Sequence, residues 1–161
     1  MPSYQSHPIP PVFDGSSRVL ILGSFPSVKS REVCFFYGHP QNRFWRVLSA
    51  LYETPIPDSV DGKREFLLAH GVALWDVIAS CEIEGSADQS IRDVRPNDVG
   101  RILSVSPIQG IFVNGKTAEK YYNTYLRETL GRSAVCLPST SPANAAWSLS
   151  ALIEAWRVIL P

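Results

Sequence analysis

Residues 23–45, GSFPSVKSREVCFFYGHPQNRFW, form the stretch that decides the fold of this 161-residue chain. They follow Arg18–Leu22 (RVLIL), a short apolar run that is bounded by glycine and is typical of a buried strand. Pro40 stands where a proline commonly starts a helix, and apolar residues then recur at helical spacing at Phe44, Val47, Leu48 and Leu51. We therefore expect a strand, a polar loop and a helix in this order. The loop then lies at the carboxyl end of the strand, where open α/β sheets bind their ligands.

The alternation of strands and helices continues along the chain. Three further apolar runs predict strands, at Val72–Ile78, Ile111–Val113 and Ala134–Pro138. The spacing of apolar residues between and after these runs predicts helices over 62–70, 97–104, 118–131 and 145–160. We interpret residues 79–93 as a polar segment without a strand. Four strands alternating with helices indicate an α/β fold, a three-layer α/β/α sandwich with a central four-stranded parallel sheet.

The length and composition fit one globular domain. A 45% share of hydrophobic residues is ample for a single core. Residues 1–14 are rich in proline and polar side chains, so we expect an extended arm that is laid over the domain or left loose, with His7 exposed to solvent. Residues 15–161 then form the single domain.

Charge and cysteine content narrow the class of protein. Fifteen Lys and Arg balance fifteen Asp and Glu, so no overall positive field indicates a nucleic-acid partner, although a local basic patch is allowed. Cys34, Cys81 and Cys136 are isolated from one another, which argues against a zinc or iron–sulfur site and against a disulfide framework. No apolar run approaches the roughly 20 residues of a membrane span. We expect a reduced, cytoplasmic monomer without metal, cofactor or membrane partner.

Polar residues follow each of the predicted strands. In a parallel sheet the carboxyl ends of the strands meet at one edge, so the loop 23–42, Asp76, Asn114 and the loop 139–144 are expected to face one cleft. An asparagine side chain accepts one hydrogen bond and donates another side by side. That pattern matches the N–H and C=O edge of uracil or hypoxanthine, and it mismatches the reversed edge of cytosine or adenine. Asn114, at a strand end, suits this role.

Four segments, in order over nearly the whole chain, resemble the uracil-DNA glycosylase superfamily. They are the run Gly23–Ser27, the block Tyr37–Trp45, the strand ending in Asn114-Gly115 and the loop Ser139–Asn144. The block is similar to that of both the mismatch-specific uracil glycosylases and the hypoxanthine-DNA glycosylases. The chain has only three cysteines, which separates it from the iron–sulfur glycosylases with their four cluster cysteines.

One departure decides between the two similar groups. The mismatch-specific enzymes carry a G-x-N-P-G first motif whose Asn positions the water, whereas this chain has Phe25 at that place. The hypoxanthine-DNA glycosylases are similar in lacking that Asn. They rely on the Asn of H-P-x-N, which is Asn42 here, with the Asn after the third strand, Asn114, in support. The chain therefore resembles the hypoxanthine-DNA glycosylase family more closely.

The resemblance implies a monofunctional DNA glycosylase that hydrolyses the N-glycosidic bond of a deaminated base in base excision repair. It implies that Asn42 and Asn114 are catalytic, that Asn42 orients a water toward the sugar carbon, and that Tyr37 stacks on the extruded base. The base-binding residues that it implies are Gly23, Ser24, Phe25, Pro26, Tyr37 and Asn114. The implied DNA-binding residues are Ser27, Lys29, Arg43, Ser139, Thr140, Ser141, Pro142, Ala143 and Asn144. Backbone N–H groups of the 24–27 turn would stabilise the departing base anion.

Several of these residues also have a structural interpretation. Asn42 could be a helix-start amide bonded to its own backbone, and Asn114 the left-handed residue of a turn before Gly115. His39 is expected to hold its loop through a backbone hydrogen bond, and Asp76 either faces the cleft or caps the next turn. The cations of the first loop and of the next helix form either a phosphate-binding patch or ordinary solvated charges; they are Lys29, Arg31, Arg43 and Arg46. The four tryptophans are assigned to the core: Trp45, Trp75, Trp147 and Trp156.

Two other classes of function stay open. A catalytically silent nucleic-acid-binding module would keep the cleft without the chemistry, and the missing first-motif Asn favours it. A small-molecule nucleoside or ester hydrolase would use Ser24 or Cys34 with His39. Within the leading interpretation, hypoxanthine, uracil and xanthine are all candidate substrates, because they share the lactam edge and differ only in size.

Overall fold

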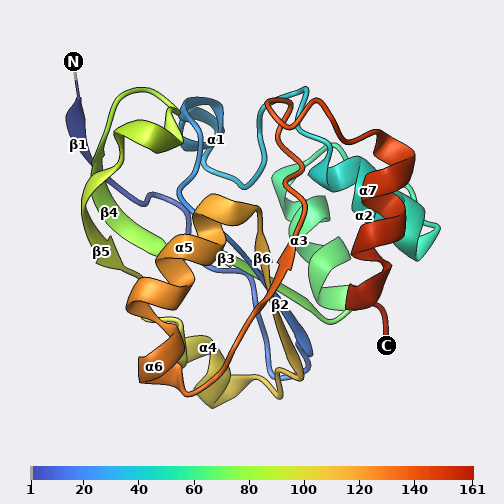
Figure 1. Cartoon of the computed structure of the whole chain (residues 1–161). Coiled ribbons are helices and arrows are strands. Elements are labelled where there is room, and N and C mark those ends of the chain that lie inside the picture. The colour runs from blue at the N-terminus through green and yellow to red at the C-terminus, as the bar shows by residue number, and fades with distance from the viewer. Residues whose placement is uncertain (1) are drawn as a thin grey trace.

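A computed structural model describes residues 2–161, and its centre is a sheet of four strands in the order β3-β2-β6-β7 (Figure 1). The strands are β2 (Val19–Gly23), β3 (Val72–Asp76), β6 (Gly110–Asn114) and β7 (Val135–Leu137). Each neighbouring pair is parallel. The four-stranded parallel sheet expected from the sequence is therefore confirmed.

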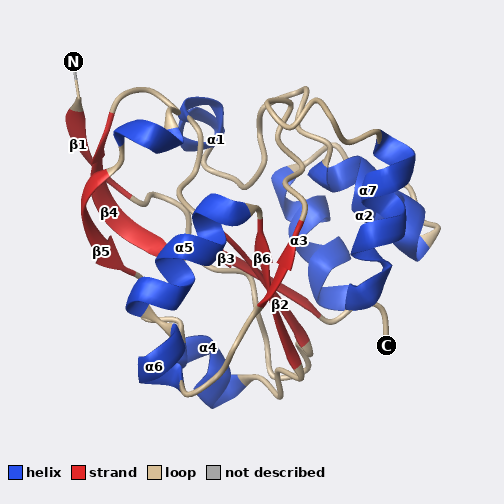
Figure 2. Cartoon of the chain, in the orientation of Figure 1, coloured by secondary structure: helices blue, strands red, loops and turns tan. Residues whose placement is uncertain are grey.

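Helices cover both faces of this sheet (Figure 2). One side carries α2 (Phe44–Tyr52), α3 (Val60–Ala69) and α7 (Leu149–Trp156). The other side carries α4 (Gly100–Val105), α5 (Lys116–Tyr125) and α6 (Arg127–Leu130). Three short helical segments complete the set, namely α1 (Val28–Val33), η1 (Asp88–Ser90) and η2 (Arg157–Ile159). The arrangement is the predicted three-layer α/β/α sandwich.

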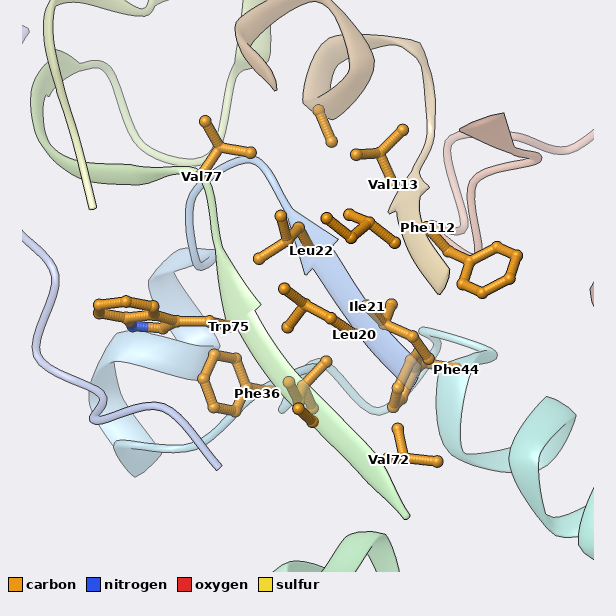
Figure 3. Packing of buried hydrophobic residues seen from close by; sticks show 14 of the residues in the cluster. Leu20, Ile21, Leu22, Phe36, Phe44, Val72, Trp75, Val77, Phe112 and Val113 are labelled. Atoms are coloured by element: carbon orange, nitrogen blue, oxygen red, sulfur yellow. The ribbon is translucent and has the colours of Figure 1, made fainter. Parts of the chain in front are cut away.

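The apolar core is centred on β2. Leu20, Ile21 and Leu22 are completely buried, because β2 has a strand on either side and helices over both faces (Figure 3). A strand buried on both faces is apolar at every position rather than at alternate ones, which is the pattern of the RVLIL run. Phe44 from α2 and Trp75 from β3 belong to the same buried cluster. The loop that follows β2 is therefore attached to a completely buried strand.

A second sheet, of three antiparallel strands, was not expected from the sequence. It has the order β1-β4-β5 and consists of β1 (Ser3–Ser6), β4 (Ile78–Ile83) and β5 (Arg92–Pro96). The chain passes from β3 directly into β4 through Val77, so it leaves one sheet and enters the other without a loop. The prediction of a strandless polar segment over 79–93 is wrong because β4 and β5 pair with each other and with a remote segment.

The N-terminal arm is extended and lies along β4, with which β1 pairs. Its first residue, Met1, lies outside the described residues. Farther along the arm, Ile9 and Val12 are buried in the core, and Val12 forms a β-bridge with Leu74. The side chain of His7 is only 3% exposed, so the expectation of a solvent-exposed histidine is wrong. Pairing with β4 places this part of the arm beside the end of β3.

Two helices begin later than the sequence indicates. α2 begins at Phe44 rather than Pro40, because the side-chain oxygen of Asn42 accepts a hydrogen bond from the Phe44 N–H at 3.0 Å. α7 begins at Leu149 rather than Ala145, because the hydroxyl of Ser148 caps it by accepting from a backbone N–H of its first turn. Trp147 therefore precedes the helix and is 38% exposed, so its assignment to the core is wrong. The helix α1 lies inside the stretch expected to be a loop.

Other expectations concern metals, cysteines and membranes. Within residues 2–161 no group of three or more His, Cys, Asp or Glu side chains could hold a metal ion. All three cysteines are free, with Cys34 exposed and Cys81 buried. In this same described part of the chain, no helix has the length and apolar character needed to cross a membrane.

Replacing Ile21 by alanine should lower the free energy of unfolding by about 2–5 kcal/mol, because the substitution leaves a cavity at the centre of the core. Urea unfolding followed by circular dichroism measures the change. Val105→Ala is the matched control, since Val105 is 55% exposed and its truncation should change stability by about 0.5 kcal/mol or less. Equal losses for the two variants would contradict a core centred on β2.

Candidate active site

The carboxyl ends of the parallel strands bring the predicted site residues to one edge of the sheet. β2 ends at Gly23, which is the register partner of Asp76 at the end of β3. β6 ends at Asn114, the register partner of Leu137 in β7, and the loop from Ser139 follows that strand. The polar residues named from the sequence are thus gathered from positions more than a hundred residues apart.

The side chain of Asn114 is tied to Thr140 by two reciprocal hydrogen bonds. Its Oδ1 accepts from the Thr140 backbone N–H at 3.1 Å, and its Nδ2 donates to the Thr140 hydroxyl at 3.0 Å. The second Nδ2 hydrogen goes to the hydroxyl of Tyr37 at 3.1 Å. Both amide hydrogens of Asn114 are therefore used within the protein. The backbone of Asn114 is not left-handed, and the following Gly115 takes the positive φ of 94°.

Thr140 is completely buried, which the sequence does not indicate. Besides the two bonds to Asn114, its carbonyl oxygen accepts a hydrogen bond from the backbone N–H of Arg43 at 3.0 Å. Thr140 thereby connects the end of β6 to the start of α2. The expectation that its side chain contacts DNA is wrong, because a fully buried hydroxyl cannot reach a phosphate.

Tyr37 lies between these strand ends and α2. Its ring stacks on Phe44, with the ring centroids 4.0 Å apart, so one ring face is already covered by the protein. Its backbone φ of 52° is left-handed, which turns the chain sharply before the H-P-x-N segment. Burial raises the pKa of the Tyr37 hydroxyl, and the nearby Asp76 carboxylate raises it further. The phenol therefore keeps its hydrogen at neutral pH. Stacking of a base on this ring stays a prediction.

The side-chain amide of Asn42 has a bonded oxygen and a free nitrogen. Its Oδ1 accepts the Phe44 N–H, so the amide does help to start α2. Its Nδ2 makes no hydrogen bond with any residue from 2 to 161, and the side chain is half-buried. One half of the amide is thus held by the backbone while the nitrogen remains available to a ligand or water.

The turn that follows β2 offers backbone donors. The N–H groups of Ser24 and Phe25 make no hydrogen bond within residues 2–161, although they follow the central strand of the sheet. Phe25 itself packs edge-on against His7 and lies under the guanidinium of Arg31 at 5.4 Å. Pro26 is buried, and Ser27 caps α1. Two adjacent free N–H groups on a rigid strand end can stabilise a negative charge.

The side chain of Arg43 binds the loop 139–147. Its guanidinium donates to the carbonyl oxygens of Ser141 at 3.0 Å, of Asn144 at 3.1 Å and of Trp147. These bonds use three of the four hydrogens on its terminal nitrogens, and contact of Arg43 with DNA stays a prediction. Pro142 and Ala143, at the tip of the loop, are exposed and stay candidates for contact with DNA.

Other predicted contacts lie farther from this centre. Lys29 is half-exposed and approaches Glu32 at 3.9 Å, so it stays available to a phosphate. The His39 ring accepts a hydrogen bond from the Gln41 N–H at 3.1 Å, which confirms its expected role in holding the loop. No hydrogen bond joins His39 to Ser24 or Cys34 within residues 2–161. The nucleophile–base pair that a serine or thiol hydrolase would need is therefore not formed by these three residues.

Sequence reasoning missed one buried pair beside the site. Nε2 of His7 and Oδ2 of Asp76 are 2.7 Å apart, and both side chains are at least 94% buried. Gly23 packs against this carboxylate so closely that a Cβ built there would lie 2.4 Å from Oδ1. Only glycine fits at that position. The His-Pro dipeptide in a proline-rich arm carries no signal that could have predicted the contact.

A parallel α/β sandwich with amides and free N–H groups at the carboxyl ends of its strands is an α/β protein with its ligand-binding edge at that place. The chain belongs to the uracil DNA glycosylase superfamily, whose family model matches residues 10–160. This confirms the resemblance seen in the sequence.

Two curated relatives and one solved structure are similar over most of the chain. A protein from Methanosarcina acetivorans named hypoxanthine DNA glycosylase is 35% identical over 152 residues, which cover 93% of this chain and 94% of the relative. One of the same name from Methanosarcina barkeri is 33% identical over 137 residues, with 84% and 85% covered. The solution structure of a candidate uracil DNA glycosylase from M. acetivorans has a TM-score of 0.80 and 31% identity, and the match covers 98% of this chain and 99% of that one.

Replacing Thr140 by valine should lower the free energy of unfolding by about 1–3 kcal/mol, because the shape is kept while one Asn114 amide hydrogen loses its buried partner. Urea unfolding measures the loss. Thr124→Val is the control, since the Thr124 hydroxyl bonds within an exposed part of α5 and its loss should change stability by about 0.5 kcal/mol or less. An unchanged stability for Thr140→Val would contradict the central role of this contact.

Proposed function

We propose that this chain is a DNA glycosylase that hydrolyses the N-glycosidic bond of a deaminated base, with hypoxanthine as the preferred base. The superfamily membership supports the reaction type, and the two relatives named hypoxanthine DNA glycosylase support the choice of base. The observation that carries the proposal is that the N–H groups of Ser24 and Phe25 are free at the carboxyl end of the central strand, and that the side-chain nitrogen of Asn42 is free as well.

The reaction makes specific demands on these groups. A base inside a duplex is unreachable, so the nucleotide first rotates out of the helix at a cost of a few kcal/mol, which is smallest for a badly paired base. Cleavage then develops positive charge on the sugar and negative charge on the base. The N–H groups of Ser24 and Phe25 are suited to the negative charge, and each well-placed donor contributes about 2.7–4 kcal/mol.

The amide of Asn42 is suited to holding the attacking water. An amide is a weak base, but an electron-poor sugar carbon requires a positioned water more than a strongly basic one. The free Nδ2 and the remaining lone pair of Oδ1 provide one donor and one acceptor for this purpose. Because the same oxygen is bonded to the Phe44 N–H, the amide is held in one orientation before the substrate arrives.

Replacing Asn42 by serine should slow excision by about 10²–10⁴-fold, because a serine hydroxyl can still accept the Phe44 N–H but lacks the amide nitrogen. Labelled duplexes that contain hypoxanthine, uracil or xanthine are incubated with the protein and then heated in alkali, which cleaves the strand at abasic sites. Gln41→Ala, an exposed neighbour, is the control and should retain the wild-type rate.

The same assay separates the alternatives. Excision by the wild-type protein that Asn42→Ser leaves unchanged would remove Asn42 from the mechanism. Binding of the duplexes without release of any of the three bases would favour a catalytically silent module.

A further inference from the structure

Asp76 is a buried carboxylate to which the proposed mechanism assigns no role. It stands at the end of β3, opposite Gly23, and its side chain is 6% exposed. One of its oxygens, Oδ2, is bonded to His7. The other, Oδ1, makes no hydrogen bond with any residue from 2 to 161, and it is not among the unpartnered side-chain atoms that are closed off from solvent, so a ligand can reach it.

His7 fixes the orientation of this carboxylate. The Nδ1 atom of His7 accepts a hydrogen bond from the Ile9 N–H at 3.2 Å, so the ring hydrogen is on Nε2 and is donated to Oδ2 of Asp76. The histidine backbone is itself bonded to β4, through the Ala79 carbonyl at 2.7 Å. Phe25 and Trp75 pack edge-on against the imidazole. The arm therefore holds Oδ2 and leaves Oδ1 directed toward Gly23.

A hydrogen-bond donor lies beside this free acceptor. The point where a Cβ on Gly23 would stand is 2.4 Å from Oδ1 of Asp76 and 3.1 Å from the hydroxyl oxygen of Tyr37. That oxygen accepts from Asn114, and the phenol hydrogen has no acceptor among residues 2–161. An unpaired carboxylate oxygen and an unpaired O–H thus both approach one point beside Gly23, at the end of the central strand.

We propose that this pair recognises the flipped base: Oδ1 of Asp76 accepts the ring N–H of a lactam, and the Tyr37 hydroxyl donates to the adjoining carbonyl. The inference rests on the proposed function and names the groups that select its substrate. The recognition falls to these two side chains rather than to Asn114, whose amide hydrogens are both used within the protein.

The chemistry separates hypoxanthine and uracil from their parent bases, adenine and cytosine, whereas guanine and thymine carry the same lactam edge and are not distinguished by this pair. Hypoxanthine, xanthine and uracil each carry a ring N–H next to a carbonyl, whereas adenine and cytosine carry a bare ring nitrogen next to an amino group. A carboxylate oxygen facing that bare nitrogen would be repelled, and the Tyr37 O–H would face an amino group. A site that requires a hydrogen bond rejects analogues that lack the partner by large factors. The Asp76 side chain is 6% exposed and Tyr37 is partly buried.

The test combines a change in the protein with a change in the base. Single-turnover excision rates are measured on duplexes that contain hypoxanthine or 1-methylhypoxanthine, whose methyl group replaces the ring N–H. Wild-type protein should prefer hypoxanthine by about 10- to 100-fold or more, because the methylated base leaves the carboxylate without a donor. Asp76→Ala should excise hypoxanthine more slowly and bring the ratio of the two rates close to one. Asp58→Ala, an exposed carboxylate elsewhere, should keep the wild-type ratio.

A second variant covers the case in which Asp76→Ala does not fold. In Asp76→Asn the His7 hydrogen holds the amide oxygen, so the NH₂ group faces the base and opposes its ring N–H; hypoxanthine excision should fall and the ratio should again approach one. A wild-type ratio retained in a folded variant at residue 76 would overturn the inference and leave the glycosylase activity standing. Absence of excision by the wild-type protein would overturn the proposed function and the inference with it.

Discussion

The paired hydrogen bonds between Asn114 and Thr140 are the contact on which the rest of the site depends. They join the end of β6 to a residue that is fully buried and that also receives the backbone N–H of Arg43. An interior amide and hydroxyl that satisfy each other are strongly held, because either one alone would lose its hydrogen bonds to water without compensation. The start of α2 and the loop 139–147 are thereby fixed to the central sheet.

Two further side chains near the carboxyl edge of the parallel sheet are also held by several contacts. Arg43 binds three carbonyl oxygens of the loop 139–147, and Tyr37 is held between the Asn114 amide and the ring of Phe44. Such side chains cannot rearrange without breaking several bonds at once. A hydrolytic site gains from this, since positioned groups need no reorganisation as charge develops in the transition state.

The two sheets supply different polar groups to this edge of the molecule. The parallel sheet supplies the strand-end amides and the free N–H groups, which are neutral and suited to a water and to a departing anion. The antiparallel sheet delivers His7 from the N-terminal arm to the single buried carboxylate at the end of β3. Gly23 is required at the junction, because any side chain there would collide with that carboxylate. The arm therefore reaches the same edge of the sheet as the proposed site.

The sequence by itself determined the parallel sheet and the helices around it, because apolar strands and amphipathic helices each have a period that local spacing records. It also located Asn42 and Tyr37, which belong to one contiguous block. The tertiary structure alone decided how the polar groups are used. His7 pairs with Asp76, which is 69 positions away, and Arg43 binds loop residues that are 98 to 104 positions away. The complete burial of Thr140 likewise depends on contacts between remote segments. No local pattern encodes a hydrogen bond between remote segments, since its partners are brought together only by the folded chain.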